Sequence, residues 1–191
     1  MKIQHSKIEH LSSYAEHLKN LSDEDRYTRF GYSPGPDAID QLILHILYNQ
    51  NQHHLFTYFD DGHIVGFGHL AQEDSDWELA VSVEQSYQGR GIADALVSHM
   101  IDWGKTHGVH AVYMHCITDN KKIQHLARKH GLKTVDRSGH EITAQVELPK
   151  ATVLDYTNNF VREQTALATD MVKLQRTWLA NWARPKHDIN N

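Results

Sequence analysis

Residues 78–83 read Glu-Leu-Ala-Val-Ser-Val, and residues 88–93 read Gln-Gly-Arg-Gly-Ile-Ala. The first run is apolar and contains β-branched side chains, which predicts a strand. The second is a tight glycine-rich loop, and a helical pattern of apolar residues begins at Gly91. Backbone N–H groups at the start of a helix have no partner within the helix, and the helix dipole is positive there. The sequence therefore predicts an anion-binding loop between a strand and a helix.

Two widespread phosphate-binding loops do not fit this stretch. A P-loop carries a Lys-Ser/Thr pair after its last glycine, whereas Gly91 is followed by Ile92 and Ala93. The dinucleotide fingerprint requires a third glycine that this loop lacks. The loop therefore belongs to another class of anion site.

The composition limits the function classes. The chain has 191 residues, of which 40% are hydrophobic, and this suits one domain with a buried core and an appendage. A net charge of −5 disfavours binding to nucleic acid or to an anionic membrane, since both favour a basic surface. No stretch approaches the ~20 apolar residues of a membrane span, and residues 1–5 lack the apolar core of a signal peptide. A single cysteine, Cys116, excludes an internal disulfide, and we expect a cytoplasmic protein.

Sixteen histidines raise the hypothesis of a metal site. Only His53-His54 and the pair of His107 and His110 lie close together in sequence, and no His-Glu-x-x-His or Cys/His ligand spacing is present. We therefore expect no metal site and interpret most of these histidines as surface residues.

The remaining elements are predicted from apolar spacing and turn residues. Apolar side chains at steps of three and four predict helices over 8–21, from about 37 to 48, over 91–108 and over 120–130, with a short helix after the cap Ser22. Apolar runs predict strands over 54–59, 63–70, 77–83, 111–116 and 141–148, with 72–76 as a polar connection. Asp60-Asp61-Gly62 predicts a hairpin turn. This order predicts an α/β (α+β) fold in which helices flank a mixed, mostly antiparallel sheet.

The pattern changes beyond Pro149. From about Tyr156 to Ala183, apolar residues recur at mostly three- and four-residue steps, which predicts a long helix with a narrow apolar seam. We therefore divide the chain into a domain over 1–150 and a helical tail over 151–191. Two hypotheses remain open for the seam: the helix packs on its own domain, or it packs on another subunit and forms a homo-oligomer.

The glycine loop resembles the acyl-CoA pyrophosphate loop of the GNAT N-acetyltransferases, in which Gln or Arg is followed by two residues, Gly, one residue, and Gly or Ala. Gln88, Gly91 and Ala93 occupy the three defined positions. These enzymes also carry an Asn after the fifth strand and, eleven residues later, a Gly that ends a helix, an interval that Asn120 and Gly131 match. The chain is identified as a member of this superfamily on these residues.

One branch of the superfamily has further similarities. The run Leu126-Ala127-Arg128 resembles the one that bacterial Pat-type protein-lysine acetyltransferases carry where many members have a tyrosine general acid. Residues 21–30 are similar to their Leu-Ser-x-x-x-Arg-Tyr-x-Arg-Phe segment, and residues 78–83 resemble their fourth strand, which opens with a glutamate. The matches together cover roughly residues 10–148. The resemblance implies a protein-lysine acceptor, whereas an isolated single domain is typical of enzymes for a small amine or polyamine.

The resemblance also implies a reaction and a site. It implies the GNAT fold with splayed fourth and fifth strands, acetyl-CoA as co-substrate, and direct acetyl transfer to a primary amine. Glu78 is the expected general base, because a lysine amine of pKa about 10.4 is mostly protonated at neutral pH. Three other side chains are alternative bases, and a backbone N–H of residue 79 or 80 is expected to polarise the thioester carbonyl. The alternative bases are His69, Asp76 and His115, and the expected cofactor contacts are Leu79, Val81, Val83, Gln88, Gly89, Arg90, Gly91, Ile92, Ala93 and Asn120.

Two alternative functions remain open. With Ala127 at the tyrosine position, no side chain there protonates the leaving thiolate, although a thiol of pKa about 8.5 can leave as the anion. The first alternative is a non-catalytic acyl-CoA-binding regulatory module that acts through the C-terminal helix. The second is a helix-tethered scaffold that binds no acetyl-CoA. Cys116, near the end of the fifth strand, is interpreted as a buried structural residue rather than a covalent acyl carrier.

Overall fold

The computed structural model describes residues 2–6, 8–158, 160 and 161. These residues form a seven-stranded sheet with the order β1-β2-β3-β4-β5-β7-β6. β4 and β5 are parallel, and the other neighbouring strands are antiparallel. The sheet is therefore mixed and mostly antiparallel, as predicted. Its strands are β1 (Lys2–His5), β2 (His53–Asp60), β3 (His63–Glu73), β4 (Asp76–Val83), β5 (Ala111–Ile117), β6 (Lys133–Ser138) and β7 (Glu141–Glu147).

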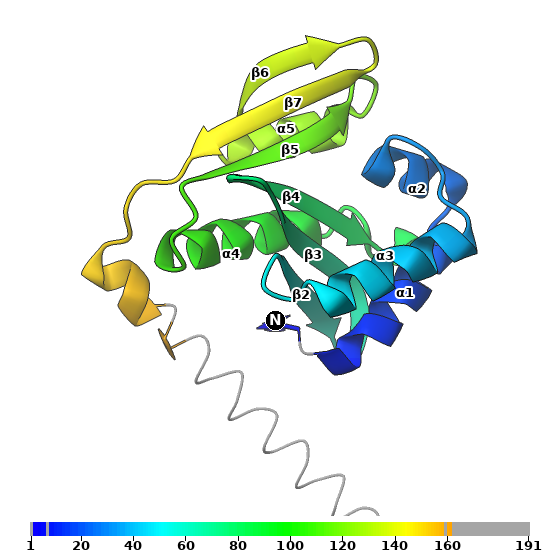
Figure 1. Cartoon of the computed structure of the whole chain (residues 1–191), viewed down its shortest axis with the longest axis horizontal. Helices are drawn as coiled ribbons and strands as arrows, with labels where there is room; N and C mark the ends of the chain where they lie inside the picture. The colour runs from blue at the N-terminus through cyan, green and yellow to red at the C-terminus, as the bar shows by residue number, and fades with distance from the viewer. Residues whose placement is uncertain (1, 7, 159, 162–191) are drawn as a thin grey trace, which may run out of the picture.

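Helices cover both faces of this sheet (Figure 1). Three of them, α1, α2 and α3, lie on one face, and α4 and α5 lie on the other. Their bounds are α1 (Leu11–Asn20), α2 (Asp23–Phe30), α3 (Pro36–Tyr48), α4 (Ile92–Thr106) and α5 (Lys121–Lys129), with short 3-10 segments at η1 (Ile8–His10) and η2 (Gln85–Tyr87).

The sheet separates two apolar clusters. The cluster under α1 and α3 includes Tyr14 and Phe67, and the one under α4 includes Leu79 and Met100. Successive side chains of a strand point to opposite faces, so β4 contributes to both layers. Leu79 packs under α4, whereas the side chain of Ser82 points to α1.

Most of the predicted elements are confirmed, and three details are corrected. β1 and β6 were not predicted, because β1 is only four residues long and every side chain of β6 is exposed. The polar connection predicted over 72–76 is wrong, because the β3–β4 ladder continues to the pair of Glu73 and Asp76. The turn therefore consists of Asp74 and Ser75, with Asp74 at a φ of +52°. The helix predicted over 8–21 begins with the separate 3-10 segment η1.

The predicted tail helix lies largely outside the described residues. Residues 153–158 are helical, as are 160 and 161. The division at residue 150 and the packing of the tail therefore stay predictions. In the part of the chain that the structure describes, no helix combines the length and apolarity that crossing a bilayer requires.

Buried His17 makes the stability of the fold depend on pH. Its Nε2 lies 2.9 Å from Oγ of Ser82, and burial lowers its pKa to about 4. Because a histidine in the unfolded chain titrates near pH 6.5, the unfolded state takes up this proton first as the pH falls. We expect His17 to remove up to ~3 kcal/mol of the free energy of unfolding between pH 6.5 and pH 4. Denaturant unfolding of His17→Gln should show a shallower loss over this range, and a slope equal to that of the wild type would contradict the assignment.

Candidate active site

β4 and β5 pair only where they begin. Trp77 pairs with Val112 and Glu78 with Tyr113, and the ladder ends there. Each strand stays paired on its other edge, β4 with β3 and β5 with β7. The two strands therefore separate, and Figure 1 shows them diverging toward α2. The splay implied by the resemblance is confirmed.

The separation leaves one edge of β4 without a strand partner over residues 79–83, among the residues described. Free N–H and C=O groups on such an edge bind an extended, amide-containing ligand in the manner of an added strand. Leu79 and Val83 are buried under α4, and Val81 is half-buried. Their predicted cofactor contacts are therefore backbone contacts.

The glycine loop leads directly into α4. Gly89 and Gly91 have φ values of +75° and +78°, a left-handed region that favours glycine, and Gly91 is the N-cap of the helix. No side chain caps this helix start, so the N–H groups of its first turn are available to an outside acceptor. Ile92 and Ala93 contribute to this turn. The pyrophosphate of an acyl-CoA fits such a site in charge and in hydrogen bonding.

The polar side chains of the loop hold the loop itself. Nε2 of Gln88 donates to Oδ1 of Asp25 at 3.1 Å and to the carbonyl of Val83 at 3.3 Å, which ties the loop to α2 and to the end of β4. Arg90 donates to a backbone carbonyl four residues earlier, and its Cζ lies 4.8 Å from the centroid of the Tyr87 ring. These side chains have partners within the protein, so the backbone N–H groups of the loop remain the predicted anion contacts.

A carboxylate that the sequence analysis missed lies in the first turn of α4. Oδ2 of Asp94 lies 2.9 Å from Nζ of Lys129, and Oδ1 lies 2.9 Å from Nε2 of His130. The hydrogen bond from Lys129 is the main cause that lowers the pKa of Asp94. These bonds tie α4 to the end of α5 and offset a negative charge beside the predicted anion site. No sequence signal joins residues so far apart in the chain.

Asn120 has a structural role at the start of α5. Its Oδ1 accepts a hydrogen bond from the backbone N–H of Ile123 at 3.1 Å, which makes it the N-cap of the helix. That cap does not use the amide nitrogen Nδ2, which supports the predicted contact to the cofactor. Ala127, on the same helix, is buried in the core beside Leu132. No polar side chain therefore occupies the position that the resemblance assigns to the tyrosine of many GNAT enzymes.

Glu78 lies where β4 and β5 part, and it is half-buried. Its neighbours across the two ladders are Ala71 on β3 and Tyr113 on β5. Its side chain shares the α1–α2 face with Ala80, two residues along the strand. Burial raises the pKa of Tyr14 and of Tyr113, and the Glu78 carboxylate raises both further. Glu78 therefore lies within electrostatic reach of two hydroxyls.

The three alternative bases lie in different environments on the same face. His69 is buried, and its Nε2 lies 3.1 Å from Nδ1 of His53. Burial, followed by the charge of Arg29, lowers the pKa of His69 well below the usual value. Asp76 and His115 are exposed, and the ring of His115 contacts Tyr113. Glu78 is the carboxylate that combines partial burial with a place at the splay.

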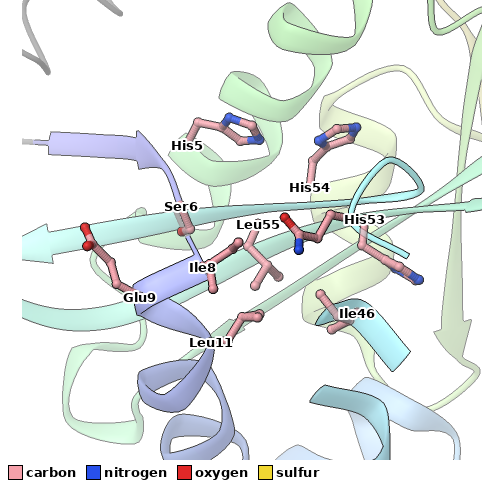
Figure 2. A pocket seen from close by; sticks show the side chains of 10 residues that line it. His5, Ser6, Ile8, Glu9, Leu11, Ile46, His53, His54 and Leu55 are labelled. Atoms are coloured by element: carbon pink, nitrogen blue, oxygen red, sulfur yellow. The ribbon is translucent and has the colours of Figure 1, made fainter. Parts of the chain in front are cut away.

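A hollow of about 430 Å³ lies between the N-terminal segment and β2 (Figure 2). No metal-binding group of three or more His, Cys, Asp or Glu residues occurs in the described part of the chain, to which the histidines that line this hollow belong. The interpretation of most histidines as surface residues fails for His17 and His69, which are buried. The hollow is lined by His5, Ser6, Ile8, Glu9, Leu11, Ile46, Gln50, His53, His54 and Leu55, so none of the predicted catalytic or cofactor residues faces it.

Known proteins share this architecture. The profile of the Acetyltransferase (GNAT) family matches residues 16–132, more than half of the chain. The GNAT domain of S. lividans PAT superposes with a TM-score of 0.65 at 16% identity, over 76% of this chain and 89% of that one. Spermidine N-acetyltransferase from Vibrio cholerae, in complex with CoA and spermine, gives 0.63 at 15% identity, over 77% and 95% of the two chains. The structure of yncA from Salmonella typhimurium with its cofactor acetyl-CoA superposes with a TM-score of 0.62 at 15% identity. The match covers 80% of this chain and 96% of that one. No curated protein matches the sequence.

These structural likenesses are low in identity and show the fold, whereas the family profile covers the loop, β4 and most of the helices around them. The splayed strands and the uncapped start of α4 are the parts of that fold that suit an acyl-CoA. The chain therefore belongs to the GNAT acetyltransferase family, whose enzymes acetylate with acetyl-CoA as co-substrate.

Proposed function

We propose that this chain transfers an acetyl group directly to a primary amine, with Glu78 as the general base. The observation that carries the proposal is the place of Glu78, at the point where the unpaired edge of β4 begins. Acetyl-CoA supplies an activated thioester, and the edge of β4 that has no strand partner over residues 79–83, together with the N–H groups of the loop, binds and orients it. Glu78 removes the proton from the amine, and a backbone N–H of Leu79 or Ala80 polarises the carbonyl that is attacked.

The charges around Glu78 favour an amine acceptor. Glu73 and Asp76 lie at the β3–β4 turn, and the hydroxyl of Tyr113 donates to Oε2 of Glu73 at 2.7 Å. Both carboxylates raise the pKa of Tyr113, after the larger effect of burial, so they lie close to the Glu78–Tyr113 pair. The carboxylates at the β3–β4 turn attract the ammonium form of an acceptor before Glu78 deprotonates it.

The buried Ala127 means that the chemistry proceeds without a side-chain acid at that position. A thiol of pKa about 8.5 is a good enough leaving group to depart as the thiolate near neutral pH. The same alanine favours a second candidate function, an acyl-CoA-binding module without turnover. A turnover measurement separates the two functions.

The test is the release of CoA thiol from acetyl-CoA by the purified protein. One set of assays contains a pool of lysine-bearing proteins, as the likeness to S. lividans PAT suggests. The other contains small amines and polyamines, as the likeness to spermidine N-acetyltransferase suggests. Release that requires an added amine supports the proposal. Binding of acetyl-CoA without release in either set favours the binding module, and no binding at all points to the scaffold.

Cys116→Ala should leave turnover intact. The thiol is buried, and burial raises its pKa to about 11, so it stays protonated and is a poor nucleophile at neutral pH. We expect kcat within about twofold of the wild type in CoA-release assays, and a stability loss of about 1 kcal/mol from the small cavity. A large loss of kcat, or an acetylated Cys116 detected by mass spectrometry, would contradict direct transfer.

A further inference from the structure

Arg29 is a cation on the same face of the sheet as Glu78. It is half-buried near the end of α2, a helix that packs against β4 and β5, and its Cζ lies 4.7 Å from the centroid of the Phe30 ring. In the portion of the chain that the structure describes, no carboxylate lies within 4.0 Å of its guanidinium. Arg29 therefore has no ion-pair partner among the described residues.

Tyr14 connects Arg29 to the reaction site. Its ring is buried, with its centroid 4.9 Å from that of Phe67 and 5.9 Å from that of His69. Burial raises the pKa of the Tyr14 hydroxyl, the charge of the Arg29 guanidinium lowers it, and the Glu78 carboxylate raises it, so both charged groups act on this hydroxyl. Arg29 on α2 and Glu78 on β4 thus act on one hydroxyl from two elements that pack against each other.

The two arginines of α2 differ in their partners. Arg26 forms an ion pair with Asp23, and its Nη1 donates to the carbonyl of Lys19 at 2.9 Å. Those contacts satisfy Arg26 within the protein. Arg29 has the Tyr14 hydroxyl and the Phe30 ring as neighbours, which leaves several N–H donors of its planar fork. That fork matches the two oxygens of a carboxylate better than any other side chain does.

We infer that Arg29 binds a carboxylate of the acceptor, so that the acceptor is an amine that also carries a carboxylate, such as a free amino acid. The inference rests on the proposed acetyl transfer and names its substrate class. The ammonium group of the acceptor faces the Glu78 carboxylate, which receives its proton. The carboxylate of the acceptor binds the Arg29 guanidinium. The strand neighbours of Glu78 on this face include the small residues Ala71 and Ala80.

Pairs of acceptors that differ only by a carboxylate test this inference. Suitable pairs are amino acids and their decarboxylation products: L-lysine with cadaverine, L-ornithine with putrescine, and L-phenylalanine with phenethylamine. We expect the wild type to show a higher kcat/KM for the amino acid of a pair. Arg29→Gln should lower kcat/KM for that amino acid about 30- to 100-fold, mainly through KM, and leave the decarboxylated amine within about twofold.

Arg26→Gln is the matched control, since it removes a guanidinium from the same helix without removing the proposed carboxylate contact. Its ratio of kcat/KM within each pair should equal that of the wild type. Arg29→Lys, which keeps the charge but loses the fork, should recover part of the preference. The affinity of Arg29→Gln for acetyl-CoA, measured by calorimetry, should be unchanged.

Two results would overturn the inference while leaving the proposed transfer intact. One is a wild type that acetylates amines without preferring the carboxylate-bearing member of any pair. The other is an Arg29→Gln variant that loses both members of a pair equally. If the wild type binds acetyl-CoA but releases no CoA even with the decarboxylated amines, the proposed transfer itself fails, and the inference fails with it.

Discussion

Glu78→Gln is expected to lower kcat about 10²- to 10⁴-fold, the range that a positioned general base contributes. The amide has nearly the shape of the carboxylate, but it cannot accept the proton of the attacking ammonium group. The residue is half-buried and shares no ion pair with a described basic side chain, so the fold should tolerate the change. Affinity for acetyl-CoA should stay within about twofold, because β4 binds through its backbone. Steady-state CoA release and calorimetric titration measure the two quantities.

The pH dependence separates a lost base from a disturbed site. As the pH approaches the amine pKa of about 10.4, the acceptor loses its proton to solvent, and the deficit of Glu78→Gln should shrink. Glu73→Gln is the matched control. It removes a nearby carboxylate, at the β3–β4 turn, which is not placed to take the proton. We expect it to raise KM for the amine with little change in kcat. Unaltered turnover in Glu78→Gln would remove Glu78 from the mechanism and leave the exposed Asp76 and His115 as the bases to test.

The parts of the fold that the sequence predicted have strong local signals. The strand over 78–83, the glycine loop and the helix after Gly91 follow from apolar periodicity and from glycine at positive φ. β6 had no such signal, because all its side chains are exposed and it pairs only with β7 at the edge of the sheet. The polar residues of the β3–β4 turn suggested a long connection, but backbone pairing does not require apolar side chains there.

The arrangement around Glu78 was less accessible from the sequence. Tyr14 on α1 feels the charges of both Arg29 on α2 and Glu78 on β4, and this depends on how the helices pack on the sheet. The pairing of Asp94 with Lys129 and His130 likewise depends on how α4 and α5 pack, and not on any interval in the chain. The resemblance pointed to the residue at the splay, whereas its electrostatic neighbours follow only from the packing of the helices on the sheet.

Gly91→Val is expected to weaken acetyl-CoA binding about 10- to 100-fold, the effect of losing hydrogen bonds to a charged ligand. Gly91 has a φ of +78°, and a β-branched residue there either carries strain of about 1–3 kcal/mol or moves out of this region. A Cβ at Gly91 would meet no atom within 4 Å, so backbone strain rather than a steric clash causes the effect. Movement of this residue re-aims the N–H groups that open α4, which are the proposed pyrophosphate contacts. Calorimetric titration with acetyl-CoA and with CoA measures the loss.

Gly108→Val is the control that makes this result specific. Gly108 follows the other end of α4 with a φ of +76°, and a Cβ there also meets nothing within 4 Å. Both variants should therefore lose a similar free energy of unfolding in denaturant titrations, about 1–3 kcal/mol. Only Gly91→Val should lose affinity for acetyl-CoA, because only this substitution strains the backbone at the start of α4, where the proposed pyrophosphate contacts lie. Equal losses of affinity would mean that destabilisation of α4 weakens binding, and the loop would no longer be supported as the pyrophosphate site.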